Sequence, residues 1–410
     1  MLSIHAAREP TAVKHRPRIG LAIAGGGPVG AMYELGVLRA LEEACDGLDL
    51  TRLDGYVGVS SGAFFAAGLA NRMNTAVLCR IFLKGECEDV AFSPEIFLRP
   101  AFREYLQRAA AAPRQGLRLL HDLLSPGNGS RWSEALNRLG GLVPTGVFDN
   151  APVERFLADL FSRHGRSNDF RTLDRKLFVI GVDLDSSEAV CFGGPGWDDV
   201  PISRAVQASS ALPGLYPPVE LRGRSFVDGA LRRTMHASVL LDRDVDLLLG
   251  INPLVPFNPT RDNSAARFGD RRIAQGGLPG VLSQTLRTML QSRMQVGLAR
   301  YPQQYPHISQ MVFEPNAIDR DLFFTNIFSF SARRRISQLG YRNTLDDLRT
   351  RRESLAPVFA RHGIQLRDDI LQDRHRVLLD ALPARVRRTE TTARLARNLD
   401  DLEHLLQHVV

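Results

Sequence analysis

Gly58-Val59-Ser60-Ser61-Gly62 lies between an apolar run, residues 56–59, and a run of small residues, 63–70. This G-x-S-x-G pattern predicts a strand that ends in a tight turn and passes directly into a helix, which presents the serine hydroxyl at the top of a sheet. The glycines permit the sharp turn and the close contact of strand and helix. The first amides of that helix would favour negative charge developing beside Ser60. Taken alone, the pentapeptide also suits an ordinary strand-to-helix turn.

An earlier strand and its glycine-rich loop indicate the fold class. The segment from Ile19 to Ala24 is almost wholly apolar, as expected for a central strand that is buried on both faces. Gly25-Gly26-Gly27-Pro28-Val29-Gly30 follows, and apolar residues then recur at helical spacing through about Ala44. Strand, loop, helix and a second strand that ends at Ser60 predict an α/β fold with a mostly parallel sheet.

The glycine-rich loop is compatible with two different chemistries. Gly25, Gly27 and Gly30 satisfy G-x-G-x-x-G, the dinucleotide-binding fingerprint. That function requires an acidic residue at the end of the next strand, which here ends in Val59-Ser60, so a dinucleotide-binding protein is the less favoured alternative. In a hydrolase, the backbone N–H groups of Gly25-Gly26-Gly27 could instead converge on the oxyanion of a tetrahedral intermediate formed at the serine.

A serine nucleophile needs a base, and Asp228 is the strongest candidate. It ends a short apolar strand, precedes Gly229 and follows the stiff segment from Leu212 to Pro218. A carboxylate shielded from water can have its pKa raised and can accept the serine proton directly. An Asp-Gly pair equally fits an ordinary hairpin turn. A histidine base is the alternative, with His236 and His307 as candidates, although neither has the glycine-flanked setting of a catalytic loop.

Composition narrows the class of protein. A chain of 410 residues with 44% hydrophobic and 24% charged residues is typical of a globular protein with a sizeable core. It contains no apolar run of about 18 residues, so no membrane-spanning helix is expected. The polar, basic residues 1–17 predict a disordered lead-in without the apolar stretch of a secretory signal. The four cysteines show no paired or metal-ligand spacing, which favours a reducing, cytoplasmic setting and no zinc site.

The net charge and the distribution of apolar residues suggest two helical segments in addition to the α/β domain. The net charge of +7 suits nucleic acid, an anionic membrane surface or simply a solvated basic surface, and we expect no nucleic-acid partner. Residues from about 79 to 147 resemble a helical insertion whose arginine-bearing, amphipathic segment could lie on lipid, although packing on the domain is favoured. We therefore expect a domain over 18–345 and a helical C-terminal extension over 346–410.

Four blocks, in this order and at this approximate spacing, resemble the patatin-like phospholipases. They are Gly25-Gly26-Gly27-Pro28-Val29-Gly30, Gly58-Val59-Ser60-Ser61-Gly62, Ala208-Ser209-Ser210-Ala211-Leu212-Pro213-Gly214 and Asp228-Gly229-Ala230. The resemblance covers roughly Arg18 to Pro253. It implies a three-layer α/β/α sandwich with a mostly parallel central sheet, and the activity of a lipid acyl hydrolase with a Ser–Asp dyad and no catalytic histidine.

The same resemblance implies roles for individual residues. Ser60 would be the nucleophile, Asp228 the base, and the amides of Gly25-Gly26-Gly27 the oxyanion hole. Four further glycines would support the turns of these motifs: Gly30, Gly58, Gly62 and Gly229. One departure is Val29, since many members of that family carry Arg or Lys just before the last glycine of the first loop, where a cation would help attract a phosphate.

The resemblance also implies the ligands. It implies a lipid or phospholipid substrate and no metal or organic cofactor, and the sequence offers no acidic loop with the spacing of a calcium site. We expect a cytoplasmic protein that could contact the inner membrane peripherally. A catalytically silent lipid-binding or scaffold protein on the same fold is the alternative. The head group, the acyl length and the oligomeric state do not follow from the sequence.

Overall fold

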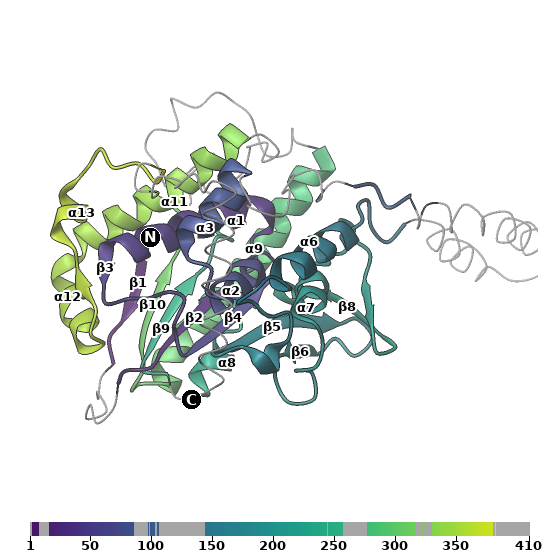
Figure 1. Cartoon of the computed structure of the whole chain (residues 1–410), viewed down its shortest axis with the longest axis horizontal. Coiled ribbons are helices and arrows are strands. Elements are labelled where there is room, and N and C mark those ends of the chain that lie inside the picture. Colours follow the sequence, from purple (N-terminus) through teal and green to yellow (C-terminus); the bar gives the residue numbers. More distant parts are fainter. Residues whose placement is uncertain are drawn as a thin grey trace, which may run out of the picture. The chain divides into compact units, whose positions relative to one another are not determined.

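A nine-stranded sheet forms the centre of the computed structural model (Figure 1). Its order is β1-β10-β9-β2-β4-β5-β8-β7, and β6 pairs with β5 beside this path. The strands from β10 to β5 run parallel, whereas β1, β6, β7 and β8 pair antiparallel with their neighbours. The strands are β1 (Leu2–His5), β2 (Ile19–Ile23), β4 (Gly55–Val59), β5 (Lys176–Asp183), β6 (Ala189–Phe192), β7 (Val219–Leu221), β8 (Arg224–Asp228), β9 (Leu247–Ile251) and β10 (Ser309–Phe313).

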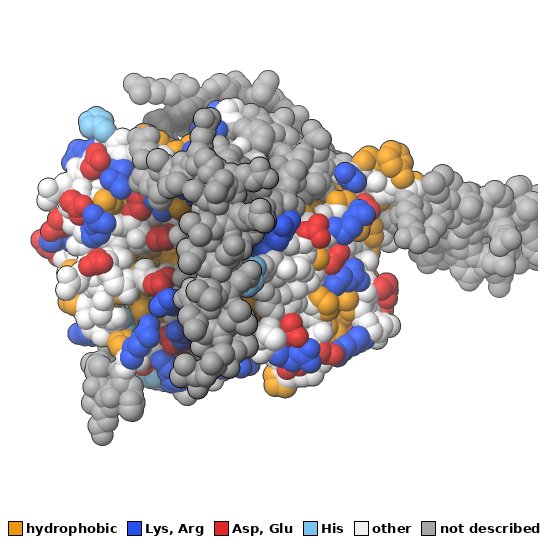
Figure 2. Space-filling model, in the orientation of Figure 1, with side chains coloured by type: hydrophobic (Ala, Val, Ile, Leu, Met, Phe, Trp, Pro, Cys, Tyr) orange, Lys and Arg blue, Asp and Glu red, His pale blue; other side chains and the backbone are white. Residues whose placement is uncertain are grey.

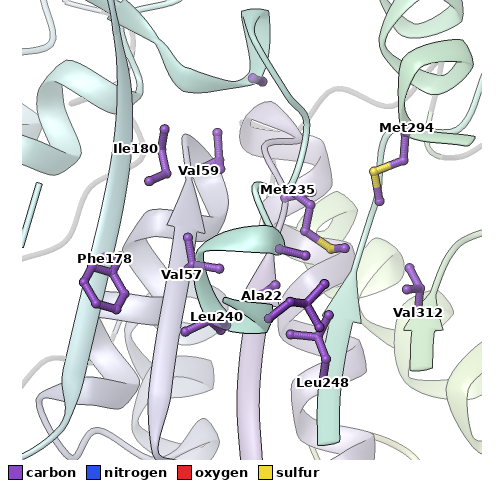
Figure 3. Close-up of a cluster of buried hydrophobic side chains, with 14 of the residues drawn as sticks. Ala22, Val57, Val59, Phe178, Ile180, Met235, Leu240, Leu248, Met294 and Val312 are labelled. Atoms are coloured by element: carbon purple, nitrogen blue, oxygen red, sulfur yellow. The ribbon is translucent and has the colours of Figure 1, made fainter. Parts of the chain in front are cut away.

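Helices cover both faces of this sheet and complete three α/β/α layers, as predicted. On one face, α8 (Ser238–Leu241) and α9 (Gly277–Gln304) pack on Ala22, Val57 and Leu248 of the central strands (Figure 3). The other face carries α2 (Ser61–Ala70), followed by further helices. These are α1 (Gly27–Ala44), α3 (Thr75–Cys79), the π-helical turn η1 (Arg80–Lys84), α6 (Ala151–Phe161), α7 (Ile202–Ser209), α11 (Phe330–Thr350), α12 (Arg352–Arg361) and α13 (Asp368–Gln372); short 3-10 turns are η3 (Phe170–Thr172) and η4 (Gly229–Leu231).

The structure describes residues 2–7, 16–85, 97, 99–102, 105, 144–243, 245–256, 277–316, 322, 330–379 and 382. Residues Met1–Leu378 form one compact unit and Leu379–Val410 a second. Most of the expected insertion over 79–147, and the expected extension beyond 382, lie outside the described residues.

The expected boundary at residue 346 is wrong, because α11 begins at Phe330 and belongs to the main unit. A Cβ atom added to Gly36 of α1 would lie 2.0 Å from the carbonyl oxygen of Ser337, and one on Gly340 would lie 2.4 Å from that of Tyr33. The two helix backbones therefore touch, which only glycine permits. A second sheet, β3 (Cys45–Asp46) with β11 (Gln365–Leu366), ties the following segment to the end of α1 as well.

The expected disordered lead-in is contradicted over its first residues. Leu2 to His5 form β1, which pairs antiparallel with β10 from Leu2 opposite Phe313 to His5 opposite Gln310. All five residues of β10 are buried, so its outer edge gains both a hydrogen-bonding partner and a cover from β1. Residues 8–15 of the lead-in lie outside the described residues.

Candidate active site

Ser60 occupies the turn between β4 and α2 that its sequence motif predicts. Its backbone has φ 51° and ψ −120°, a sparsely populated conformation for a residue with a side chain. Strand and helix come so close that a Cβ on Gly58 would lie 2.5 Å from the Cα of Ala63. A Cβ on Gly62 would lie 2.4 Å from the carbonyl oxygen of Ile23. The motif glycines therefore let the turn hold Ser60 above the carboxyl edge of the parallel strands.

The pairing register of β5 brings Asp228 to Ser60. Strand β4 pairs with β5 up to Val59 opposite Ile180, and β8 pairs antiparallel with β5 down to Asp228 opposite Gly181. Strand β6 pairs with one edge of β5. Strands β4 and β8 therefore both pair with the opposite edge of β5, and their C-terminal residues, Val59 and Asp228, meet there. A Cβ on Gly229 would lie 2.2 Å from the carbonyl oxygen of Ile180, so this meeting also requires a glycine after the aspartate.

The Asp228 carboxyl group is buried, with 3% of the residue exposed. Burial raises its pKa to about 6, while hydrogen bonds from the Ser60 side chain and from the Ala230 amide act in the opposite direction. The Ala230 N–H donates to Asp228 Oδ1 at 2.9 Å. The carboxyl group is thus oriented by one backbone amide and is poised to exchange a proton near neutral pH.

Residues of the block Ala208–Gly214 hydrogen-bond to the backbone of both Ser60 and Asp228. The Ser60 N–H donates to Ser209 Oγ at 2.8 Å, and that hydroxyl donates to the Ile180 carbonyl oxygen at 2.5 Å. The Asp228 N–H donates to the Ala211 carbonyl oxygen at 3.0 Å. The sequence identified this block only through a resemblance, whereas these contacts show that it holds the backbone of both Ser60 and Asp228.

The glycine loop lies against Ser60, but two of its three amides are engaged elsewhere. A Cβ on Gly25 would lie 3.1 Å from the Ser60 Cβ. The Gly25 N–H donates to the Thr234 carbonyl oxygen at 3.2 Å, and the Gly26 N–H donates to Ser61 Oγ at 2.8 Å. In the part of the chain that the structure describes, no hydrogen bond to the Gly27 N–H is recorded. Of the three amides expected to form an oxyanion hole, those of Gly25 and Gly26 thus have other acceptors, and Gly27 has φ 60°.

A buried glutamate, which the sequence did not identify, stands behind this loop. Glu34 of α1 is completely buried, and its Oε1 accepts a hydrogen bond from the Ser61 hydroxyl at 3.0 Å. Among the residues that the structure describes, its Oε2 has no hydrogen-bond partner. Burial raises the pKa of Glu34 well above its ordinary value, while the hydrogen bond from Ser61 acts in the opposite direction. Glu34, Ser61 and Gly26 thus form a chain that fixes the loop relative to the serine turn.

A cavity of about 290 Å³ opens above Ser60 and Asp228. Its walls are mainly apolar and come from α1, α2, α9 and the segment after α7. Asp228, Arg287 and Arg333 are its charged lining residues, and burial lowers the pKa of each arginine to about 10. Such a cavity suits a long apolar group whose reactive end reaches Ser60.

The two candidate histidines lie apart from the serine hydroxyl. His236 is buried, its Nε2 lies 3.3 Å from the Gly229 carbonyl oxygen, and burial lowers its pKa to about 4. His307 is exposed and precedes β10, at the amino edge of the parallel strands, whereas Ser60 lies at the carboxyl edge. The aspartate is therefore the titratable side chain that meets the serine among the residues described.

No group of three or more His, Cys, Asp or Glu among the described residues is placed to hold a metal ion. Of the four cysteines, Cys45, Cys79 and Cys191 are free. Within the described ranges, no helix has both the length and the apolar character needed to cross a membrane.

The fold and the site define an α/β protein with a serine in a strained strand-to-helix turn, beside a buried carboxyl group and a glycine loop. A family model described as patatin-like phospholipase matches residues 21–241. The chain belongs to this family, and it is an ester-bond hydrolase of lipids.

Solved structures of similar proteins cover much of the chain at low identity. VipD from Legionella pneumophila is 14% identical, with 91% of this chain and 83% of VipD covered and a TM-score of 0.31. Human GIVD cytosolic phospholipase A2, in complex with methyl gamma-linolenyl fluorophosphonate, is also 14% identical, with 83% and 60% covered and a TM-score of 0.31. ExoU from Pseudomonas aeruginosa, in its complex with SpcU, is 19% identical, with 90% and 67% covered and a TM-score of 0.27. At these TM-scores the likenesses add nothing to the assignment of the site.

Proposed function

We propose that this protein is a serine acyl hydrolase of lipid esters in which Ser60 is the nucleophile and Asp228 its only base. The observation that carries the proposal is the meeting of the carboxyl ends of β4 and β8 on one edge of β5, which places a buried carboxyl group against the serine. The family membership supplies the reaction class. The pair of residues is our inference.

The reaction divides into two similar halves. Ser60 Oγ attacks the ester carbonyl carbon while its proton passes to the Asp228 carboxylate. The carbonyl oxygen becomes an oxyanion that the Gly27 N–H stabilises, an effect worth roughly 3 kcal/mol per donor in other hydrolases. The intermediate collapses to an acyl-enzyme, and the leaving alkoxide takes the proton from Asp228. A water molecule then gives a proton to Asp228 as it attacks the acyl carbon. When this second intermediate collapses, the bond to Ser60 Oγ breaks, the proton on Asp228 returns to that oxygen, and the fatty acid leaves.

The cavity favours lipids with long acyl chains over small esters. Phe64, Phe65 and Leu286 are among the apolar side chains that line it, and each methylene that such a wall removes from water contributes about 0.8 kcal/mol. Water bound near Asp228 would be displaced by the acyl chain, which keeps the carboxyl group in an apolar setting during the first step.

Hydrolysis of a soluble p-nitrophenyl ester by wild type, Ser60→Ala and Asp228→Asn tests the proposal. We expect turnover by wild type and rates near background for both variants. Matched controls are Ser186→Ala and Asp185→Asn, because both side chains are exposed on the turn after β5, and both should retain wild-type activity. Substantial activity in folded Asp228→Asn would overturn the dyad. A wild type that is inactive on this ester and on micellar lipid would favour a silent lipid-binding protein.

A further inference from the structure

Helix α9 carries most of the exposed large hydrophobic side chains. Of the seven among the described residues, four lie on this helix: Val281, Leu282, Met289 and Val296. The last three are 58%, 57% and 53% exposed and recur every seven residues, which places them on one line along the helix. Single apolar residues on a surface need no explanation, but an apolar line along one helix indicates a binding surface.

This line adjoins the buried side of α9. Leu290 and Met294 point inward and belong to the buried cluster over the sheet, where Figure 3 draws Met294 beside the strands. Ser283 and Leu286 line the cavity above Ser60. At about 100° per residue, Met289 lies roughly 100° around the helix from Leu290 and roughly 140° from Met294. One helix therefore has an inner face that forms the cavity wall and, next to it, an outer face whose apolar line is exposed.

The charges of α9 are of one sign. Between Gly277 and Gln304 the sequence contains three arginines and no aspartate or glutamate. Arg293 and Arg300 are exposed and, by helical spacing, flank the apolar line. The Arg293 Nη1 also donates to the Leu231 carbonyl oxygen at 3.1 Å, which ties the helix to the loop after Asp228. An apolar line flanked by cations complements an anionic lipid interface.

We propose that the outer face of α9, formed by Val281, Leu282, Met289 and Val296 with Arg293 and Arg300 beside them, docks on an anionic lipid bilayer. The proposal rests on the proposed function, since a docked α9 would place its inner face, the cavity wall, next to the source of acyl chains. This proposal assigns the expected peripheral membrane contact to a helix of the central unit, whereas the sequence suggested the insertion over about 79–147.

Co-sedimentation of the full chain with vesicles tests the docking separately from catalysis. The protein carries Ser60→Ala so that lipid is not consumed, and the vesicles are phosphatidylcholine alone or with roughly one third phosphatidylglycerol. We expect binding to the anionic vesicles that weakens steeply as NaCl rises from roughly 0.05 to 0.5 M. Adding Leu282→Ser, Met289→Ser and Val296→Ser should lower the bound fraction at least about tenfold.

Two further variants sharpen the test. Adding Arg293→Gln and Arg300→Gln should remove most of the salt dependence and leave weak binding to both kinds of vesicle. The matched control is Leu184→Ser, since Leu184 is 49% exposed on the turn after β5 and should bind as its parent does. If the triple serine variant loses its circular dichroism spectrum, the single change Leu282→Asp replaces it, with the same expectation.

Three results would overturn the docking proposal. The parent could fail to sediment with either vesicle, the triple variant could bind as well as its parent, or light scattering could reveal a dimer that the triple variant converts to a monomer. The last result would make this face a protein interface. Turnover of the soluble ester by wild type is measured in parallel, so a failure of the proposed catalysis is distinguishable from a failure of docking.

Discussion

At the scale of single residues, the candidate site contains a serine with an unfavourable backbone conformation and two carboxyl groups whose burial disfavours their charged form. Ser60 has a left-handed backbone, Asp228 is a buried carboxyl group with a pKa raised to about 6, and Glu34 is a buried carboxyl group whose pKa burial raises well above its ordinary value. Each arrangement costs stability, and each is held in place by contacts from distant parts of the chain. Mutations here should therefore change stability and activity in opposite directions.

The activity should depend on pH through Asp228. The base must be deprotonated to accept the serine proton, and its pKa is raised to about 6. We expect kcat/KM for a soluble ester to be constant above about pH 7 and to fall about tenfold per unit well below pH 6. An activity that persists unchanged to about pH 4.5 would contradict Asp228 as the base.

Removing the charge of Asp228 should stabilise the fold. Between the unfolded value of 3.8 and about 6, the native protein binds more protons than the unfolded chain, so wild-type stability falls as pH rises through this window. The free energy of unfolding of Asp228→Asn, relative to wild type, should therefore increase by about 2 kcal/mol between about pH 4 and pH 7. Urea unfolding at both pH values measures it, with Asp185→Asn as the control that shows no such change.

Glu34 should act as a hydrogen-bond acceptor that positions the glycine loop. Glu34→Gln keeps an oxygen for the Ser61 hydroxyl and should retain kcat within about threefold. Glu34→Met has a similar shape without that acceptor, and should lower kcat at least about tenfold with KM little changed, since the loop would lose its alignment with the oxyanion. Equal losses of kcat in both variants would argue against this role.

At the scale of elements, the sequence predicts regular segments well where their pattern is local. β5, β6 and α7 have such local patterns, because each is a mostly buried run between clear turn residues. Asn150 is at the N-cap of α6, but its side chain makes no capping bond and instead pairs with Gln207. The sequence did not predict β10, because its first two residues, Ser309 and Gln310, are polar. Both are buried in the fold, and this burial depends on the partner strands.

For the candidate site, too, the sequence indicates the parts with a local motif and misses those that depend on contacts between distant segments. Ser60, Asp228 and the glycine loop follow from short motifs, whose local backbone demands are visible in the sequence. Ser209, Glu34 and Ser61 were not assigned roles, because their importance comes from contacts between segments that are far apart in the chain. A buried glutamate on a helix has no local signature that separates it from an exposed one.

The contact between α1 and α11 should tolerate no side chain at its glycines. In Gly340→Ala the new Cβ would meet the Tyr33 carbonyl oxygen at 2.4 Å, so the helices must separate and lose buried contacts. We expect a loss of at least about 2 kcal/mol in urea unfolding. The control is Gly297→Ala on α9, where nothing lies within 4 Å of the new atom and the higher helix propensity of alanine should give a small gain.

At the scale of the whole central unit, strands from opposite ends of the chain close one side of the sheet. β1 covers β10, and the Arg351 guanidinium bonds the Leu2 carbonyl oxygen, so three distant segments meet there (Figure 1). On the face shown in Figure 2, cationic and acidic side chains are mixed over the described surface, so the single-sign charge of α9 is a local property of that helix.

Deleting residues 1–7 should destabilise the sheet at this edge. β10 would become an edge strand with an unpaired row of backbone groups. We expect a lower Tm and concentration-dependent aggregation, both measured by light scattering during heating. The control replaces His5, the exposed end of β1, with alanine and should behave as wild type. A truncated chain that stays monomeric with an unchanged Tm would show that β1 is dispensable.

The hydrogen bond between Ser60 and Ser209 spans 149 residues of the chain. During synthesis on the ribosome, the serine turn therefore emerges long before the segments that orient it and supply its carboxyl partner. Under the proposed mechanism, a nascent chain that ends before Asp228 has the serine without its base and should be inactive. The order of the strands would thus delay the onset of activity until most of the central unit has been made.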